Sequence, residues 1–418
     1  MSQVILSVKN YNIKFLKDKK ILYITKNISL DLYAGEVLAL VGESGSGKSV
    51  FSSSLINLLG SNGYITGGKV IFEPNAPRPV DLTSLYQHSV DKAAKKRFIK
   101  FNNKEIKRLR LLENAAETEA DKNQVTYKIN ILEKEIKLYS DILKNKGKYT
   151  KKYIKEKTRD VRGKYIATIF QDASLALNPL LSVGNQICES LKLHTDLQGK
   201  QIKAKAIDLL KDVGINNPED SFHMLPSNYS GGMRQRVLIA IAIASNPKIL
   251  IADEPTTALD VTIQAQIIEL LKTLKDKYNM SIIFITHDLG VVANIANRVA
   301  IMYAGQIVEY GKTKEIFYDP KHPYTWSLLS SLPQLSSAGK KLSSLEGTPP
   351  SPHQEIIGDP FAIRNKYAID IDFLYDPPFF KVSPTHYAKT WLLHENAPVI
   401  KKPIILTKLT KLLRGVIK

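Results

Sequence analysis

The 418-residue sequence has a single cysteine and no long apolar run, and both absences narrow the classes of protein it fits. The one cysteine, Cys188, excludes an internal disulfide or a cysteine-ligated metal site, which suits a reducing compartment. The longest purely apolar stretch runs from Val237 to Ala244, far short of the roughly 20 residues that a helix needs to cross a bilayer. We therefore expect no membrane-spanning segment. Met1 to Asn10 also lack a basic segment followed by an apolar one, so we expect no secretory signal.

Acidic residues are scarce, but the resulting positive charge is concentrated in two stretches. The chain has 59 Lys and Arg against 40 Asp and Glu, a net charge of +19. Residues 91–159 hold 21 basic and 10 acidic residues (+11), and residues 401–418 hold six basic residues and no acid (+6). The rest of the chain is close to neutral, so this charge does not reveal a substrate. We predict that residues 403–418 form a basic amphipathic helix on the inner membrane surface; the alternative is docking on the protein itself.

Glycine and proline are absent between Pro79 and Gly147, which favours long helices there. Apolar residues in this stretch alternate spacings of four and three, as a helix seam requires. They are Val125, Ile129, Leu132, Ile136, Tyr139 and Leu143. A less regular helical stretch lies upstream of the polar segment 117–123. We interpret residues 80–160 as an inserted basic helical hairpin.

A glycine-rich segment follows the apolar strand predicted over 37–41 and precedes a helix predicted over 48–59. Its residues are Gly42, Glu43, Ser44, Gly45, Ser46, Gly47, Lys48 and Ser49, which match the phosphate-binding loop pattern. Glycines let successive N–H groups surround phosphate oxygens, Lys48 reaches the β- and γ-phosphates, and the Ser49 hydroxyl ligates Mg²⁺. With Val50, these residues are the predicted nucleotide-binding set, and ATP and Mg²⁺ are the predicted cofactors.

Two adjacent carboxylates, Asp253 and Glu254, end a second apolar strand predicted over 249–252. A phosphate loop needs a carboxylate for its metal and a group that orients water. We predict that Asp253 ligates Mg²⁺ and that Glu254 is the general base.

A second anion-binding turn, Ser230-Gly231-Gly232, opens another predicted helix. One nucleotide pocket does not need two such loops, so the second should serve another nucleotide. Here the chain resembles the ATPase subunits of ABC transporters, whose signature motif contacts ATP held by the opposing subunit. The resemblance covers most of residues 1–320. It implies that Gln171 senses Mg²⁺ and γ-phosphate, and that Asp260 and His287 are the D-loop aspartate and the switch histidine.

The resemblance also implies an aromatic residue stacked on adenine, for which Phe15 is the first candidate and Tyr23 the second. Within the family, the chain looks most like the ATPase subunits of oligopeptide and dipeptide permeases. The segments that carry this likeness are Leu177-Asn178-Pro179, His322-Pro323-Tyr324-Thr325 and Gly347-Thr348-Pro349-Pro350.

One departure from these relatives concerns iron. Many of them have cysteines in their carboxy-terminal extension that can hold an iron–sulfur cluster. Here Asp359, Asn365 and Thr390 stand where thiols would be expected, and residues 358–390 contain no cysteine. We therefore expect no cluster.

The predicted fold is α/β: a P-loop NTPase core with a RecA-like lobe, an antiparallel β subdomain and a helical subdomain at about 174–245. We assign residues 1–79 and 161–318 to this ATPase domain, 80–160 to the hairpin insertion, and 319–418 to a carboxy-terminal extension with a basic tail.

The resemblance implies an importer ATPase on the cytoplasmic face of the membrane. Its expected partners are a second ABC ATPase in a heterodimer, two transmembrane permease subunits and, indirectly, an extracellular peptide-binding protein. Nickel or another small solute remains an alternative cargo. An SMC-type nucleic-acid ATPase, or a binding protein without ATPase activity, is disfavoured because the insertion precedes Gln171 and because Lys48, Glu254 and His287 are all present. We expect no nucleic acid.

Overall fold

A computed structural model describes residues 3–73, 79–116, 118–145, 147, 149–257, 259–332, 345–354, 356–403 and 406. None of the helices in these ranges combines the length and the apolar character needed to span a bilayer. The tail helix predicted over residues 403–418 falls outside the described residues except for Pro403 and Leu406. Leu406 is buried and belongs to an apolar cluster that also contains Val41 and Ile301 of the central sheet.

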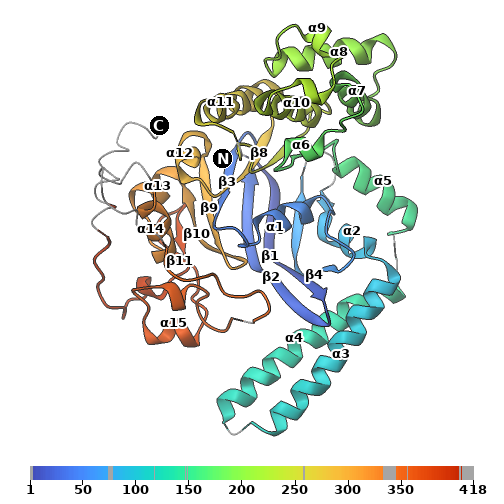
Figure 1. Cartoon of the computed structure of the whole chain (residues 1–418). Helices are drawn as coiled ribbons and strands as arrows, with labels where there is room; N and C mark the ends of the chain where they lie inside the picture. Colours follow the sequence, from blue (N-terminus) through green and yellow to red (C-terminus); the bar gives the residue numbers. More distant parts are fainter. Residues whose placement is uncertain are drawn as a thin grey trace.

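An eight-stranded sheet forms the centre of the molecule, in the order β11-β12-β10-β9-β3-β8-β7-β6 (Figure 1). The five strands from β9 to β6 are parallel, and β10, β11 and β12 extend the sheet in antiparallel pairs. Every residue of β3, β7 and β8 is buried, because the strands of a parallel sheet are covered on both faces. The strands are β3 (Val37–Val41), β6 (Ile166–Ile169), β7 (Ile249–Asp253), β8 (Ser281–Thr286), β9 (Arg298–Tyr303), β10 (Gln306–Lys312), β11 (Phe380–Lys381) and β12 (Tyr387–Ala388).

A four-stranded antiparallel sheet in the order β2-β1-β4-β5 packs beside the central sheet. Its inward residues, such as Leu6 and Phe72, share one apolar cluster with Leu38 of β3 and Ile251 of β7. The two sheets therefore have a common core. The strands are β1 (Val4–Lys17), β2 (Lys20–Tyr33), β4 (Gly63–Phe72) and β5 (Val80–Asp81).

Helix α1 (Lys48–Leu55) follows β3, as the sequence predicted, but it ends four residues before the predicted Leu59. The chain leaves the helix at Ile56, and Asn57 adopts a left-handed φ of 56° that a helix cannot continue. Other helices of this lobe are α11 (Val261–Tyr278), α12 (Leu289–Ile295) and α13 (Thr313–Tyr318).

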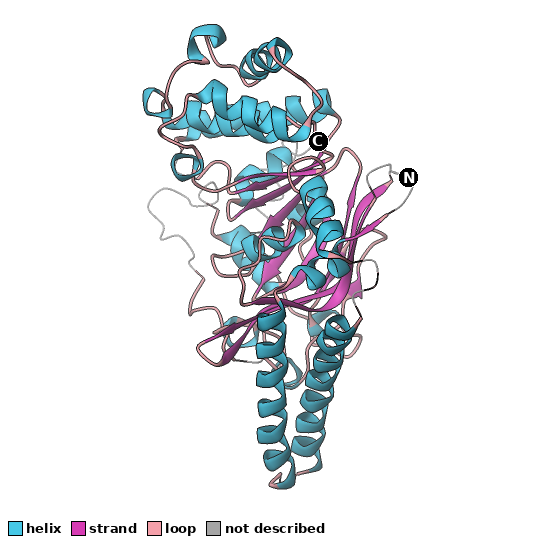
Figure 2. Ribbon diagram, turned by 90° about the vertical axis from the view of Figure 1, so that its right-hand side faces the viewer, coloured by secondary structure: helices cyan, strands magenta, loops and turns pink. Residues whose placement is uncertain are grey.

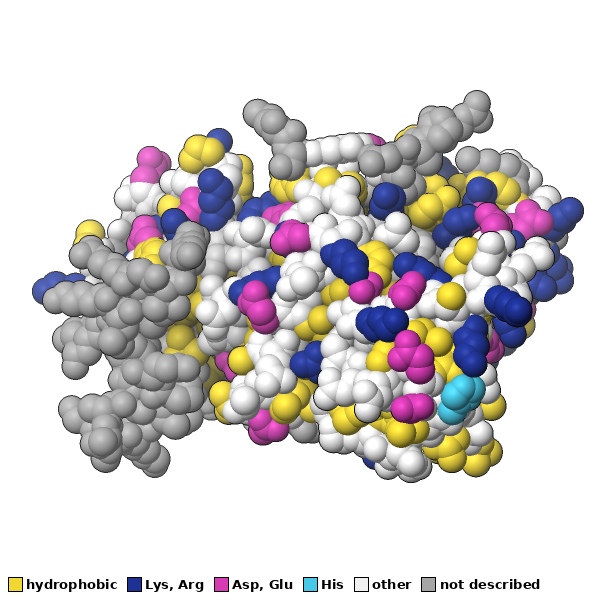
Figure 3. Space-filling view, turned by 90° about the horizontal axis from the view of Figure 1, so that it is seen from above, with side chains coloured by type: hydrophobic (Ala, Val, Ile, Leu, Met, Phe, Trp, Pro, Cys, Tyr) yellow, Lys and Arg dark blue, Asp and Glu magenta, His cyan; other side chains and the backbone are white. Residues whose placement is uncertain are grey.

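A group of helices packs against one face of β6 and β7 and lies at the top of Figure 1. Helix α10 is apolar on all sides from Val237 onward, and Val237, Ile239, Ala240 and Ile243 are fully buried. Seen from above, the described part of this end carries interspersed acidic and basic side chains (Figure 3). The helices are α6 (Ala173–Ala176), α7 (Val183–His194), α8 (Lys200–Asp212), α9 (Pro218–Ser221), η1 (Pro226–Asn228) and α10 (Gly231–Ile243).

The described residues of the inserted segment form four helices, of which the two longest make an antiparallel hairpin that projects from the body (Figure 2). Helix α4 starts within the polar segment 117–123, where the Thr118 hydroxyl accepts the N–H of Asp121 and caps the helix. The helices are α2 (Leu82–Ser89), α3 (Lys92–Asn114), α4 (Glu119–Lys144) and α5 (Lys151–Val161).

The base of the hairpin packs against the antiparallel sheet. Tyr64 of β4 stacks on Phe98 of α3 with ring centroids 4.3 Å apart. Nearby, Glu135 of α4 pairs with Lys14 of β1 at 2.6 Å and accepts a hydrogen bond from Asn102 of α3 at 3.2 Å, with all three side chains buried. The hairpin is thus attached to the antiparallel sheet by aromatic packing and by a buried ion pair.

The extension lies along the β10 side of the central sheet, and its β12 pairs with β10. Its regular elements are short, because prolines interrupt the chain. They are α14 (Pro323–Ser330), η3 (Ala362–Arg364), α15 (Asp370–Leu374), β11, β12 and η4 (Trp391–Leu393).

Candidate functional site

The glycine-rich loop lies between the carboxyl end of β3 and the first turn of α1. Gly45 and Gly47 have φ values of 80° and 98°, which residues with a Cβ rarely adopt. A Cβ at Gly42 would collide with the backbone carbonyl of Met302 in β9. The loop is therefore closely packed as well as tightly turned.

Lys48 folds back into this loop. Its Nζ donates to the carbonyl oxygens of Gly42 at 2.7 Å and Glu43 at 2.9 Å, and to Ser46 Oγ at 3.3 Å. Burial lowers the pKa of Lys48, and the nearby carboxylates of Glu254, Asp253 and Glu43 oppose that shift. The ammonium group thus lies beside loop amides at a helix amino terminus, an arrangement suited to an anion.

Ser49 and Asp253 meet across the loop and β7. Ser49 Oγ donates to Asp253 Oδ1 at 3.2 Å, and burial raises the pKa of Asp253 while the Ser49 hydrogen bond lowers it. The described residues contain no cluster of three or more His, Cys, Asp or Glu side chains able to hold a metal. Magnesium needs no such cluster, because one or two protein oxygens plus phosphates and waters complete its shell. This hydroxyl–carboxylate pair fits that requirement.

Glu254 is the centre of a second polar group. Its carboxylate accepts hydrogen bonds from Gln171 Nε2 and Thr257 Oγ1, each at 3.0 Å, and lies 3.3 Å from His287 Nδ1. Its own N–H donates to the carbonyl of Ile285, with a φ of 47° that turns the chain sharply away from β7. Gln171, Glu254 and His287 follow the neighbouring strands β6, β7 and β8, so parallel pairing brings them together.

The Ser230-Gly231-Gly232 turn lies elsewhere, at the start of α10. Ser230 Oγ accepts the N–H of Met233 at 3.3 Å and so caps the helix. Asp260 caps α11 in the same way, accepting the N–H of Ile263 at 3.0 Å. In the described part of the chain, no hydrogen bond or ion pair connects this turn to the glycine-rich loop.

The two aromatic candidates lie on opposite faces of their sheet. Phe15 is partly buried and packs against the core shared by the two sheets. Tyr23 and Gly45 both line a cavity of about 940 Å³ between the hairpin, β2 and the extension. The choice between Phe15 and Tyr23 for adenine stacking stays a prediction.

Three residues reach the site without having been predicted. Thr257 lies in the turn after Glu254 and had no distinguishing signal. Tyr324 and Arg364 of the extension contact Glu43. Tyr324 belongs to a segment noted only for its likeness to relatives, and no spacing rule connects residues so distant in sequence.

Comparison with known families places most of the chain in two models. The model described as "ABC transporter" matches residues 25–141 and 126–257. The model described as "Oligopeptide/dipeptide transporter, C-terminal region" matches residues 308–371. Together they include the glycine-rich loop, Gln171, Asp253 and Glu254, and the start of the extension.

Curated relatives match along nearly the whole chain. The oligopeptide transport ATP-binding protein AmiE of Streptococcus pneumoniae is 44% identical over 97% of this chain and 94% of its own length. OppD of Bacillus subtilis, also an oligopeptide transport ATP-binding protein, is 44% identical over 96% and 92%. The dipeptide transport ATP-binding protein DppD of Lactococcus lactis subsp. cremoris is 41% identical over 95% and 93%.

Solved structures agree on the fold. An ATP-binding cassette dimer bound to ADP and phosphate is 22% identical, with a TM-score of 0.50 over 74% of this chain and 98% of that one. A subunit of a Clostridium perfringens ABC transporter complex has a TM-score of 0.51 over 76% and 91%, at 22% identity. The P-loop NTPase fold and the family predicted from the sequence are confirmed: this chain belongs to the ATP-binding subunits of ABC transporters, with the carboxy-terminal region of the oligopeptide and dipeptide branch.

Proposed function

We propose that this chain is the ATP-hydrolysing subunit of an importer that takes up oligopeptides or dipeptides. The observation that carries the proposal is the extent of the match to oligopeptide and dipeptide transport ATP-binding proteins, which includes the extension. The subunit would lie at the cytoplasmic face of the membrane as a peripheral protein.

In the proposed mechanism, the glycine-rich loop and Lys48 bind the β- and γ-phosphates of ATP. Ser49, Asp253 and Gln171 would hold Mg²⁺, which when bound neutralises part of the triphosphate charge. Preorganisation supports these roles, because Lys48 already lies against the loop that would receive the phosphates.

Glu254 is proposed to accept a proton from the attacking water. The contacts from Gln171, Thr257 and His287 fix the direction of its carboxylate, so that little reorganisation precedes the reaction. His287, whose side chain is 61% exposed, is proposed to reach the γ-phosphate when the site closes.

Ser230, Gly231, Gly232 and Asp260 are proposed to serve a nucleotide held by a second ATPase subunit. Their position at the starts of α10 and α11, apart from this chain's own phosphate loop, supports that reading. Two subunits meeting head to tail would bury two ATP molecules, and only the ATP-bound pair would close. We propose a heterodimer.

The membrane partners would dock beside Gln171. Several apolar side chains of the described residues are exposed in this region, among them Phe170 (48%), Leu175 (85%), Leu180 (84%) and Leu181 (39%). Exposed apolar groups of this kind suit short helices from the two permease subunits. Peptide choice would then lie in the permeases and an extracellular binding protein.

Affinity purification of the chain from membranes tests the proposal. We expect two permease subunits and a second ATPase to be recovered with it. A Leu175→Asp, Leu180→Asp double variant should lose the permeases, whereas Leu193→Asp, a matched change at a residue 63% exposed on α7, should keep them. Recovery of ribosomes or chromatin in their place would contradict the proposal.

A further inference from the structure

The extension touches the phosphate loop directly. Arg364 donates from Nη1 to Glu43 Oε2 at 2.6 Å and from Nη2 to Glu43 Oε1 at 3.1 Å. The Arg364 side chain is only 4% exposed, and it also donates to Tyr303 Oη at 3.1 Å and to the Glu346 carbonyl at 2.9 Å. A bidentate guanidinium–carboxylate pair with little exposure fixes both distance and orientation.

A second contact holds the backbone of the same residue. The N–H of Glu43 donates to the hydroxyl of Tyr324 at 2.9 Å. Tyr324 is fully buried and packs with Tyr303 and Phe361, with ring centroids 4.6 to 5.4 Å apart. Both the side chain and the main chain of Glu43 are therefore held by the extension, and Tyr303 of β9 supports the two residues that hold it.

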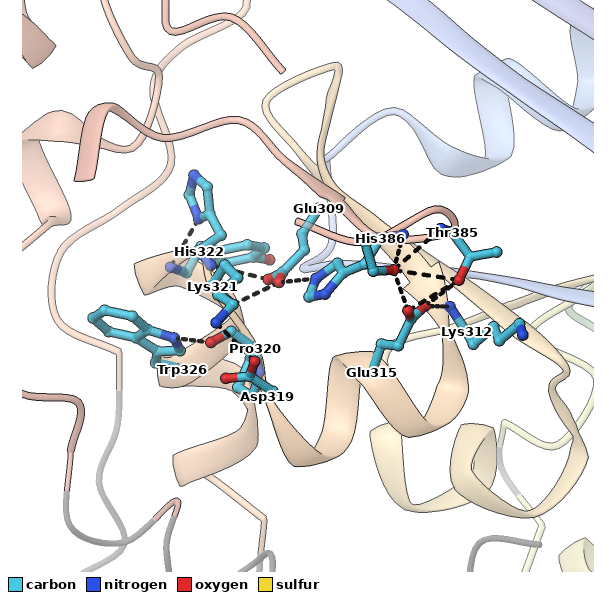
Figure 4. Close-up of polar contacts among 12 residues, drawn as sticks. Glu309, Lys312, Glu315, Asp319, Pro320, Lys321, His322, Trp326, Thr385 and His386 are labelled. Carbon is cyan, nitrogen blue, oxygen red and sulfur yellow. Dashed lines mark hydrogen bonds and ion pairs between the residues drawn. The ribbon is translucent and has the colours of Figure 1, made fainter. Parts of the chain in front are cut away.

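The extension itself is firmly attached at this point. Glu309 of β10, which is fully buried, accepts the N–H groups of Lys321 and His322 at 2.6 and 3.1 Å and contacts His386 Nε2 at 2.8 Å (Figure 4). His322 Nδ1 in turn accepts the N–H of Tyr324 at 3.0 Å. The sheet thus fixes the start of α14, from which Tyr324 reaches the loop.

Two physical effects follow for an anionic ligand. Glycine-rich segments lose much conformational freedom when they become ordered, so a loop already held at Glu43 should bind phosphates at a smaller entropic cost. Glu43 also places a negative charge in the loop, and the guanidinium of Arg364 neutralises it. Losing Arg364 would expose the triphosphate to that charge.

We propose that Arg364 and Tyr324 are positioning residues that hold the phosphate loop, through Glu43, in the conformation that binds ATP. The extension is then a direct contributor to nucleotide affinity. The inference rests on the proposed role of residues 42–49 as the phosphate loop.

The test is ATP affinity of the purified full chain, with thermal unfolding measured in the absence of nucleotide. Arg364→Met should weaken ATP binding about tenfold, Arg364→Lys should recover part of the loss, and Tyr324→Phe should weaken binding by a smaller factor. The control is Lys366→Met, two residues beyond Arg364, which removes a cation from an exposed pair with Glu346. It should leave ATP affinity unchanged.

A double-mutant cycle separates positioning from a general effect on folding. If Arg364 acts through Glu43, Arg364→Met combined with Glu43→Gln should bind ATP no more weakly than Arg364→Met alone. Additive losses, or unchanged affinity in both Arg364→Met and Tyr324→Phe, would overturn the inference. Lys48→Ala distinguishes this failure from that of the phosphate-loop assignment, because unchanged ATP affinity in Lys48→Ala would contradict the assignment itself.

Discussion

Replacing Glu254 by glutamine removes one negative charge while keeping the size of the side chain. The carboxylate is only 16% exposed and has three side-chain partners, so the amide should occupy the same place. A glutamine cannot accept a proton from water at neutral pH. We expect hydrolysis to fall at least 10²-fold, which corresponds to about 2.7 kcal/mol of transition-state stabilisation.

ATP binding should survive this change. Glu254 lies close enough to Lys48 to influence its pKa, so removing the negative charge should not disfavour a triphosphate. The assay is phosphate release by the assembled transporter at saturating ATP, together with ATP affinity. Glu269→Gln, at a residue 71% exposed on α11, is the matched control and should hydrolyse normally. Near-normal hydrolysis by the Glu254 variant would refute its assignment as the base.

Four further predictions concern binding, pH, the hairpin and iron. Lys48→Ala should weaken ATP binding rather than slow the hydrolysis of bound ATP, and a titration with ATP measures the affinity. Burial raises the pKa of Asp359 to about 7, so this carboxyl should increasingly destabilise the folded state as pH rises from about 4 to 7, by up to about 4 kcal/mol. Asp359→Asn should flatten that dependence in thermal unfolding scans from pH 4 to 8; an unchanged slope would contradict the assignment. Replacing residues 105–130 with a short turn, which spares the embedded base of the hairpin, should leave basal ATP hydrolysis intact, and loss of activity in a folded variant would show the hairpin to be required. The purified protein should fold and pair without iron, so stoichiometric iron with a visible charge-transfer band would count against the expected absence of a cluster.

The core of the fold follows from local sequence patterns. Apolar runs over 37–41 and 249–252 predicted buried strands, and β3 and β7 are buried at every position. Because polar residues at the carboxyl ends of neighbouring parallel strands meet at one edge, the approach of Glu254 to Gln171 and His287 is a consequence of topology. Their chemical roles remain predictions.

Contacts between distant segments could not be predicted in the same way. Arg364 and Glu43 are 321 residues apart, and neither periodicity nor spacing indicates such a pair. The buried Lys14–Glu135 pair, which joins the first strand to the insertion, was equally unpredictable, because it forms only through tertiary packing. The predicted end of the first helix at Leu59 was wrong for a local reason: α1 stops at Leu55 because Asn57 adopts a left-handed conformation.

Peptide uptake driven by ATP is the most direct test of the central proposal. The complex purified with this chain should be reconstituted in liposomes with ATP on the side that exposes the subunit, and accumulation of a labelled peptide followed. We predict uptake with the wild-type chain and at least a 10²-fold slower rate with Glu254→Gln in an equally assembled complex. Equal uptake with both chains, or uptake independent of ATP, would contradict the account.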